Sequence, residues 1–442
     1  MSAVSGPQID TRVIWAIALP AMVTNVATAL IGLGDMWIVG RLGDAPTQGA
    51  VDIGARLFAM LFTVMNFLKT GTTGLVAQEG ERAGGDAQTM VLVKGLFVGL
   101  VIAILLLLAK PVLLPVLLSA LGAEGPVLEA ARIYAEIRYW SAPGVMLNLA
   151  LMGFLIGQRR MMEVLWIEIA YNALNIGLGA WLTLQLDWGI AGIGWSSFIA
   201  EYAKLAVLLA LVFRGPFSAY LIKCLSKLPF GWATLKPFLS LNRDLFLRTV
   251  VLMLALAALT RLSAERGPDV LAANGILYQM FALTALLLDG FENAAQVLNG
   301  ERVGARDRDG FAAYVRAILW RGLGAAAVVA LFFAVLGNPI LASFAATEAV
   351  AREAQAQAIW LVIIPFAGVA SFVFDGVFVG ASWTRVMLLS MAGATVVFGL
   401  ALWLSWPLGN SALWGSFVLF LSVRAVLQAA MMPARMRASF GS

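Results

Sequence analysis

The chain has no histidine and only one cysteine, Cys224, among its 442 residues. Without histidine it lacks the side chain that most often binds metals and most readily exchanges protons near neutral pH. A single cysteine excludes a disulfide framework and any metal site built from several cysteines. Carboxylates are therefore the groups left for proton chemistry, and we expect no metal and no other cofactor.

Charge is also scarce. Only 12% of the residues are charged, 61% are hydrophobic, and the mean hydropathy is +0.89. A soluble globular domain contains about 25% charged residues, so this composition predicts a long helical membrane protein. The net charge of +5 does not point to nucleic acid, because basic loops are expected at the cytoplasmic membrane face. The N-terminus lacks the pattern of a cleaved signal peptide.

A membrane span needs about 20 mainly apolar residues, and about twelve stretches of the chain meet this requirement. They are Val13–Val39, Val51–Val76, Met90–Leu118, Leu128–Ile156, Val164–Leu186, Ile190–Phe213, Leu245–Ala264, Val270–Leu298, Phe311–Leu336, Ala349–Val379, Val386–Trp406 and Ala412–Met432. No nucleotide-binding loop of the form GxxxxGK[ST] occurs, which argues against ATP as the energy source.

The connections between these stretches alternate in charge. One set holds about fifteen Lys and Arg residues, whereas the other holds little beyond Arg41 and Arg266. Because basic connections stay on the cytoplasmic side, we expect both termini to be cytoplasmic.

The chain also repeats itself. "GERAG" at Gly80–Gly84 returns as "GERVG" at Gly300–Gly304, and proline and glycine anchors elsewhere recur at the same separation of about 220 residues. This predicts two six-span lobes, residues 1–213 and 245–442, joined by a cytoplasmic connection over residues 214–244. Parallel repeats of this kind are typical of transporters, with the site near the bilayer midplane between the halves.

Polar residues follow one face of the first predicted span, where Asn25, Thr28, Gly32 and Asp35 recur at helical spacing. A charged side chain at bilayer depth costs roughly 2.5–3.5 kcal/mol on insertion scales, and it usually has a function. A medium of low dielectric also favours the neutral form of a carboxyl group. We therefore interpret Asp35 as the residue that binds and releases a proton or sodium ion. The alternative is an aspartate neutralised by a fixed partner for packing alone.

The fifth predicted span carries a second polar face, with Glu168, Asn172, Asn175 and Gly179 spaced by four, three and four residues. The asparagines there would orient Asp35 or contact substrate. The alternative is that they only join helices through hydrogen bonds. For Glu168, the alternative is an ion pair with the arginines that precede this span.

The other polar residues of the spans include one expected ion pair and several candidate site residues. Asp52 and Arg56, four residues apart, are expected to neutralise each other. Lys69 either snorkels to the interface or is a counter-ion within a cavity, and Asp289 begins a polar face of the eighth span. The predicted substrate chamber is lined by Asn25, Thr28, Asn172, Glu168, Lys69 and Asp289. Three further carboxylates are weaker candidates: Glu201, Glu292 and Asp375.

Several stretches occur in a specific order along the chain, among them "LIGLGDMWIVGRLG" at Leu30–Gly43, "NALNIGLGAWL" at Asn172–Leu182, "LLDGFENAAQ" at Leu287–Gln296 and "FDGVFVGAS" at Phe374–Ser382. Together they resemble the multidrug and toxic compound extrusion (MATE) family, in its DNA-damage-inducible protein F (DinF)-like branch. The resemblance implies twelve transmembrane helices in two pseudo-symmetric six-helix lobes, the fold of the MOP superfamily. It further implies a multidrug efflux antiporter of the bacterial inner membrane, a monomer that exports organic, often cationic compounds in exchange for protons or sodium.

The resemblance also assigns residues. It places the coupling carboxylate of the first span at Asp35 and the fifth-span asparagine of the family at Asn175. The family usually has an aspartate four residues after that asparagine, where this chain has Gly179. The two-carboxylate arrangement is therefore incomplete, which leaves the coupling ion open.

Two other classes of protein fit less well. A lipid or lipid-linked oligosaccharide flippase of related architecture is expected to carry several cationic residues inside its spans, and by sequence only Lys69 and Arg56 qualify. A membrane-embedded enzyme would need clustered carboxylates or histidines at one membrane face, and the sequence shows none. We therefore expect a transporter and not an enzyme.

Overall fold

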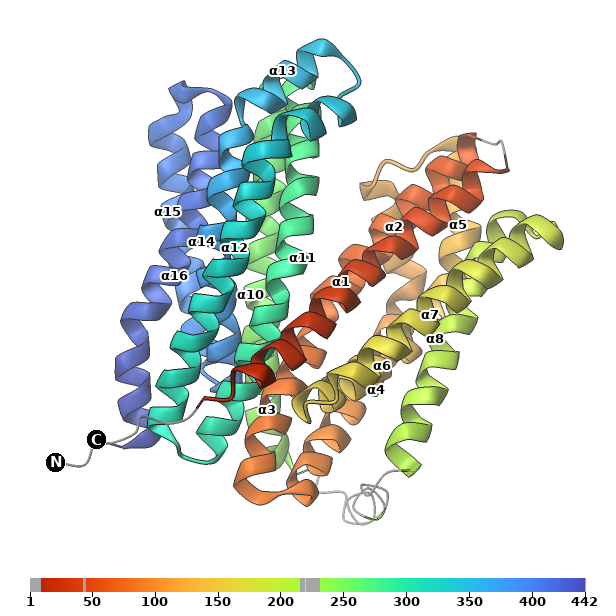
Figure 1. Cartoon of the computed structure of the whole chain (residues 1–442). Coiled ribbons are helices and arrows are strands. Elements are labelled where there is room, and N and C mark those ends of the chain that lie inside the picture. The colour runs from red at the N-terminus through yellow and green to blue at the C-terminus, as the bar shows by residue number, and fades with distance from the viewer. Residues whose placement is uncertain (1–8, 43–44, 215–218, 220–230, 442) are drawn as a thin grey trace. The chain divides into compact units, whose positions relative to one another are not determined.

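The computed structural model describes residues 9–42, 45–214, 219 and 231–441, and the elements within these ranges are all helical (Figure 1). The helices are α1 (Thr11–Gly40), α2 (Ala45–Met65), α3 (Phe67–Ala83), α4 (Gly85–Ala120), α5 (Gly125–Tyr139), α6 (Ala142–Gly157), α7 (Met161–Ala180), α8 (Gly189–Arg214), α10 (Trp232–Glu265), α11 (Pro268–Gly304), α12 (Arg308–Phe344), α13 (Glu348–Ala356), α14 (Ala358–Gly380), α15 (Thr384–Ser405) and α16 (Asn410–Phe440). A π-helical turn, Trp181–Gln185, extends α7, and a 3-10 turn, Trp406–Leu408, follows α15.

The number of membrane spans agrees approximately with the sequence. Within the described ranges, ten helical segments are long and apolar enough to cross a membrane, and the bent pair α5 and α6 would make an eleventh. Helix α7 is less apolar because it carries Glu163, Glu168, Asn172 and Asn175. Its 20 residues still cover about 30 Å, which matches the hydrocarbon thickness.

One predicted span is broken. The stretch Leu128–Ile156 forms α5 and α6, which meet at an angle of 50°. Helix α6 carries Pro143 in its first turn, and proline lacks the amide that a continuous helix would need there. The break leaves the carbonyl of Trp140 free to accept a hydrogen bond of 3.0 Å from the Tyr202 hydroxyl of α8.

Two other predicted boundaries differ from the structure. The stretch Ala349–Val379 divides into the short, charged helix α13 and the apolar helix α14. Helix α10 begins at Trp232, so residues 232–244, which the sequence analysis places in the connection, are helical. The basic residues Lys223 and Lys227 of that connection lie outside the described residues.

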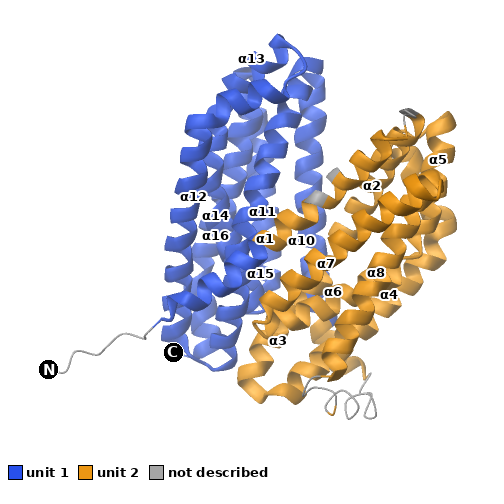
Figure 2. Ribbon diagram, turned by 45° about the vertical axis from the view of Figure 1, so that its right-hand side comes forward, with its two compact units in different colours: residues 1–22, 239–442 blue, residues 23–238 orange. Residues whose placement is uncertain are grey.

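The chain forms two compact units, coloured separately in Figure 2. One contains residues 1–22 and 239–442, and the other contains residues 23–238. The first turns of α1 thus belong to the unit of the later helices. There Trp15 contacts Phe291 edge to face at 5.4 Å, and the missing side chain of Gly290 makes room for the carbonyl oxygen of Ala18.

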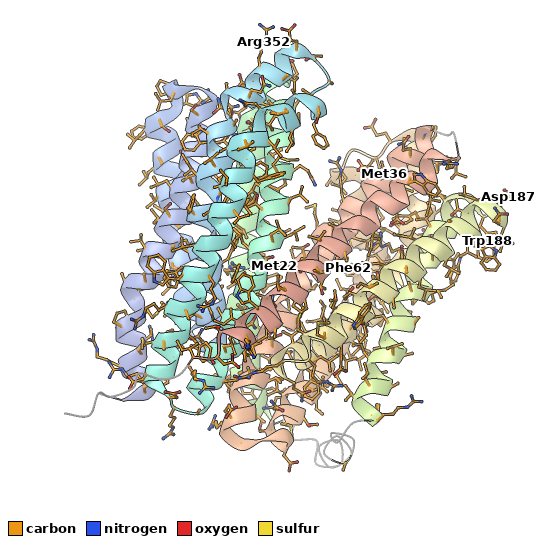
Figure 3. The ribbon with its side chains drawn as sticks, in the orientation of Figure 1. Met22, Met36, Phe62, Asp187, Trp188 and Arg352 are labelled. Carbon is orange, nitrogen blue, oxygen red and sulfur yellow. The ribbon has the colours of Figure 1, made fainter. Side chains whose placement is uncertain are left out.

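Each unit has its own aromatic core. In residues 23–238, the rings of Phe58, Tyr134 and Tyr139 are buried among α2, α4 and α5. In the other unit, Trp414 and Phe417 of α16 contact each other and anchor a cluster with α10, α11, α14 and α15. Charged side chains such as Arg352 of α13 project away from these cores (Figure 3).

The predicted repeat is visible in how the helices of each unit touch. A methyl group added to Gly153 of α6 would lie 2.5 Å from the Lys69 carbonyl oxygen of α3, and one added to Gly157 would lie 2.8 Å from that of Thr73. In the other unit, a methyl group added to Gly376 of α14 would lie 2.2 Å from the Glu292 carbonyl oxygen of α11, and one added to Gly380 would lie 2.4 Å from that of Gln296. Each residue of the second set comes 223 positions after its counterpart. Small residues allow such backbone approach in membrane helices.

Candidate functional site

Asp35 lies in the second half of α1, where only 3% of its surface is exposed. Its Oδ1 atom has no hydrogen-bond partner in the described part of the chain. Helix α1 contacts α7 here, because Gly34 lets the Ile176 side chain approach to within 2.7 Å of where a Cβ would be. A buried carboxylate oxygen without a partner is unusual in a folded protein and calls for an explanation.

The facing side of α7 supplies more buried polar atoms of this kind. Asn175 donates a 3.2 Å hydrogen bond to the Ser197 hydroxyl of α8, while its own Oδ1 has no partner among the described residues. Neither amide atom of Asn172 has one. The structure therefore gathers three unpartnered oxygen atoms, from Asp35, Asn172 and Asn175, on two helices that touch.

Gly179 completes this face without a carboxylate. A Cβ at this position would lie 3.1 Å from the Ser196 hydroxyl of α8 and 3.2 Å from the side chain of Ile38. The site of the missing family aspartate is thus packed against both α1 and α8. A side chain would fit only after these neighbours moved by a few tenths of an ångström.

A cation near Asp35 escaped the sequence analysis. Arg138 of α5 lies close enough for its charge to act on the carboxylate, yet no ion pair joins the two within the described residues. The guanidinium instead donates to the Tyr134 hydroxyl and lies 5.1 Å from the ring centre of Phe58. Arg138 thus balances the charge of Asp35 from a distance and leaves its oxygen free for a ligand.

The other end of the α7 face is closed by an ion pair. Glu168 is buried and binds Lys204 of α8, whose ammonium lies 4.6 Å from the ring centre of Tyr171. The alternative of a pair with the preceding arginines is wrong, because Arg160 pairs with Glu163. Glu168 is therefore neutralised by a residue 36 positions away in the sequence.

The remaining candidates of this unit have settled partners. Thr28 donates its hydroxyl to the Thr24 carbonyl of the same helix at 2.9 Å, and Asn25 and Lys69 also have interaction partners. The expected pair of Asp52 and Arg56 is confirmed at 3.0 Å. Glu201 accepts a 2.7 Å hydrogen bond from Asn148.

The unit of residues 1–22 and 239–442 holds a second buried charge cluster. Asp375 of α14 is fully buried, and its carboxylate binds Arg248 of α10 and, at 2.9 Å, Arg424 of α16. Gln428, one turn beyond Arg424, donates to the other carboxylate oxygen at 2.7 Å. Both carboxylate oxygens of Asp375 therefore have partners, whereas Oδ1 of Asp35 has none among the described residues.

Two carboxylates of α11 stand next to this cluster. Asp289 and Glu292 lie close enough for their charges to act on both arginines. Asp375 is thus the carboxylate that both guanidinium groups bind. The expectation that only Lys69 and Arg56 are cations inside the spans is wrong, because Arg424, which is buried, and Arg248, whose side chain is 15% exposed, lie within helices of membrane length.

Comparison with known proteins agrees with this arrangement of repeated helices. Residues 20–181 and 245–403 match the family model described as MatE. The chain belongs to the MATE family. The predicted resemblance is thereby confirmed.

Individual relatives within the MATE family cover nearly the whole chain. DNA damage-inducible protein F of Escherichia coli is 34% identical over 95% of this chain and 91% of its own length. The probable multidrug resistance protein NorM of Bradyrhizobium diazoefficiens is 26% identical over 81% of this chain and 77% of its own. The resemblance to the DinF-like branch is therefore confirmed as well.

A solved MATE structure establishes the fold. The crystal structure of MATE in the bent conformation superposes with a TM-score of 0.89 and covers 98% of this chain and 96% of that one, at 17% identity. At this identity the likeness concerns the fold alone. It confirms the predicted fold class, an all-α multi-pass membrane protein with MATE architecture, and the family is one of transporters.

Proposed function

We propose that this protein is a secondary active multidrug efflux antiporter, which exports organic, often cationic compounds in exchange for protons or sodium ions. The observation that carries the proposal is Asp35, a buried carboxylate whose Oδ1 has no partner among the described residues, on a helix that contacts α7, the helix of Asn172 and Asn175. Membership of the MATE family and the similarity to a probable multidrug resistance protein support an efflux role.

The proposed cycle is alternating access. A cationic compound enters from the cytoplasm or inner leaflet and is held while Asp35 is ionised. Ion or proton binding at Asp35 from the outside neutralises the site and weakens its hold on the cation, which then leaves outward. Neutralisation also lowers the desolvation cost of closing the site, and the bound proton or sodium then exits inward. A membrane potential of 100 mV supplies about 2.3 kcal/mol per charge moved.

The two coupling ions make different demands on the site. A proton needs only the free oxygen of Asp35, whereas sodium needs several oxygen ligands, which the side-chain carbonyls of Asn172 and Asn175 can offer. Glu168, Lys69 and Asp289 remain proposed chamber residues. We place the protein in the bacterial inner membrane as a monomer with both termini in the cytoplasm.

A dye-efflux assay tests the proposal. Wild type, Asp35→Asn and the control Asp52→Asn are reconstituted in proteoliposomes loaded with ethidium. Each is given a pH gradient without sodium, and then a sodium gradient without a pH difference. We expect one gradient to drive efflux in wild type and in Asp52→Asn, because Asp52 belongs to a surface ion pair. We expect Asp35→Asn to lose efflux at least about tenfold, since it removes the group that exchanges charge.

Two outcomes would contradict the proposal. Efflux that survives in Asp35→Asn removes this residue from the coupling site. A wild type that moves no dye under either gradient argues for the alternative, a flippase of related architecture, which lipid-scrambling measurements then test. The contacts of the buried arginines do not favour that alternative, because Arg248 and Arg424 both bind the Asp375 carboxylate.

A further inference from the structure

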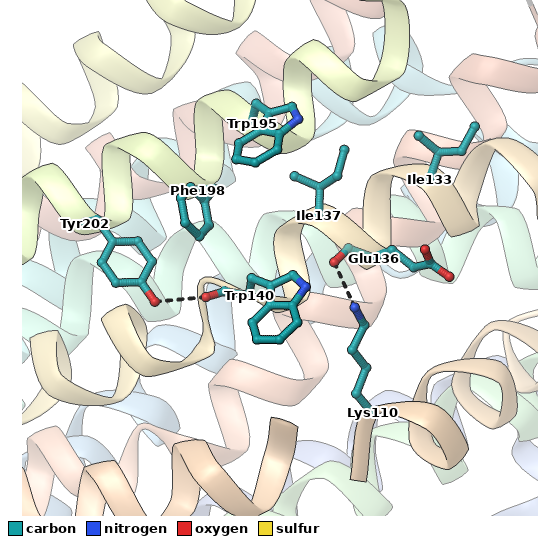
Figure 4. A pocket seen from close by; sticks show the side chains of 8 residues that line it. All are labelled: Lys110, Ile133, Glu136, Ile137, Trp140, Trp195, Phe198 and Tyr202. Atoms are coloured by element: carbon teal, nitrogen blue, oxygen red, sulfur yellow. Dashed lines mark hydrogen bonds between the residues drawn. The ribbon is translucent and has the colours of Figure 1, made fainter. Parts of the chain in front are cut away.

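A concave site with other lining residues than Asp35, Asn172 and Asn175 lies in the unit of residues 23–238. Its volume is about 510 Å³, within the range of about 300–1,000 Å³ that small-molecule sites occupy. The walls come from α4, α5 and α8, and Figure 4 shows their side chains. They are Lys110, Ile133, Glu136, Ile137, Trp140, Trp195, Phe198 and Tyr202.

The break between α5 and α6 shapes this hollow. Trp140 sits at the break, and its ring is about half exposed, at 52%. The Tyr202 hydroxyl binds the Trp140 carbonyl and holds the broken end against α8 (Figure 4). Trp195 and Phe198, which contact each other edge to face at 5.4 Å, form the opposite wall.

Lys110 brings an uncompensated charge to the hollow. Its ammonium donates to the Glu136 backbone carbonyl at 3.2 Å and lies 5.0 Å from the Trp140 ring centre, but it forms no ion pair within the described ranges. The Glu136 carboxylate is occupied by Arg132 at 2.8 Å. The hollow therefore presents one positive charge against an aromatic wall, which suits an anionic group attached to an apolar body.

The long side chain of Lys110 can reach the level of lipid phosphates. Helix α4 has 36 residues, about 54 Å in length, so a centred helix extends about 12 Å beyond the roughly 30 Å hydrocarbon core at each end. Lys110 lies ten residues before the end of α4, or about 15 Å, and so lies near the boundary of hydrocarbon and headgroups. The helix face beside it is lipid-facing, because Leu105, Leu108 and Val112 are strongly exposed.

We propose that this hollow binds one phospholipid of the surrounding bilayer, with its phosphate on Lys110 and its glycerol and acyl chains along Trp140, Trp195 and Phe198. The predicted topology assigns it to the outer leaflet. The phosphate neutralises the positive charge of Lys110, and the tryptophans supply the amphipathic rings that favour the membrane interface. The proposal depends on the membrane position of α4 and not on which compounds are exported.

Native mass spectrometry of the full-length protein tests this. Wild type is titrated with phosphatidylglycerol and with diacylglycerol of the same chains, which lacks the phosphate. We expect phosphatidylglycerol to bind about tenfold more tightly, and Lys110→Gln to abolish this preference, because charge-assisted hydrogen bonds to phosphate are the strong ones. Lys110→Arg should retain the preference, and Trp195→Ala should weaken both lipids. Arg352→Gln is the matched control, since it removes an equal charge from an exposed site on another unit.

The outcomes separate clearly. Equal loss in Lys110→Gln and Arg352→Gln would mean that bulk charge, not this hollow, attracts the lipid. A wild type that binds both lipids equally would also overturn the proposal. If Lys110→Gln fails to fold, the lipid preference of wild type together with the effect of Trp195→Ala decides the question.

Discussion

At the scale of single residues, the buried aspartates Asp35 and Asp375 differ in how their charge is balanced. Asp375 binds Arg248, Arg424 and Gln428, so its negative charge is compensated within the packed helices. Asp35 has only a cation at a distance, Arg138. A fully paired carboxylate stabilises structure, whereas an incompletely satisfied one is suited to exchanging a ligand. The contrast fits a structural role for Asp375 and the transport role that we propose for Asp35.

The structural role of Asp375 predicts a stability effect. Arg424→Met should lower the free energy of unfolding by about 3–5 kcal/mol, because it leaves a buried charge with one partner fewer. The double variant Arg424→Met with Asp375→Leu should recover a substantial part of this loss. Thermal unfolding in detergent, analysed as a double-mutant cycle, measures both effects.

A matched control belongs to that measurement. Arg352→Met breaks an exposed contact with Glu348 at 3.9 Å and should change stability by less than about 0.5 kcal/mol. If Arg424→Met costs no more than this control, the cluster around Asp375 does not stabilise the unit.

At the scale of helices, glycines set how closely neighbouring elements approach. Gly153 and Gly157 seat α6 on the backbone of α3, and Gly376 and Gly380 seat α14 on α11. For Gly153, Gly376 and Gly380 the nearest atom to a new methyl group is a backbone carbonyl oxygen, at 2.5 Å or less, and for Gly157 such an oxygen lies at 2.8 Å. Backbone cannot rotate away as a side chain can, so these positions tolerate no substitution without a shift of the helices.

This contact predicts opposite effects for two glycine substitutions. Gly376→Ala should destabilise the protein by about 1–3 kcal/mol, the usual cost of overpacking. Gly399→Ala in α15, where no heavy atom lies within 4 Å of the new methyl group, should be neutral or stabilising by up to about 1 kcal/mol, because alanine favours helix. Midpoints of thermal unfolding for both variants check this, and equal effects would show that the α11–α14 contact yields easily.

At the scale of the whole chain, the two halves share one pattern of helix contacts but carry different chemistry. Gly153 packs against the carbonyl of Lys69 in one half, and Gly376 packs against the carbonyl of Glu292 in the other. Likewise, Asp35, Asn172 and Asn175, which carry oxygens without a partner among the described residues, lie in residues 23–238, and the charge cluster around Asp375 lies in the other unit. Repetition thus preserved the packing, while the buried charges diverged.

The predicted topology of the whole chain can be tested with introduced cysteines. In a Cys224→Ser background, Asp309→Cys before the body of α12 should react with a membrane-impermeant maleimide only from the cytoplasmic side. Ala346→Cys, between α12 and α13, should react only from the outside. Both positions are exposed. Labelling of right-side-out and inverted vesicles measures this, and reversed or two-sided reactivity would refute the proposed orientation.

Sequence patterns that act over short distances predicted much of this protein. Composition alone determined the membrane class, because apolar content over about 20 residues is a local property. The repeat and the family resemblance were also readable from order and spacing, and the family match confirmed the resemblance. The Asp52–Arg56 pair was predictable for the same reason, since residues four apart on a helix are neighbours.

The partners of the buried charges were decided only by the tertiary structure. Arg248 and Asp375 are 127 positions apart, and Glu168 finds Lys204 on the next helix rather than a nearby arginine. The break at Trp140 depends equally on the Tyr202 hydroxyl of a distant helix. Whether a buried charge is neutralised or left open to a ligand depends on which helices meet around it. Spacing along one helix cannot reveal that, so the contrast between Asp35 and Asp375 appears only when the helices are packed.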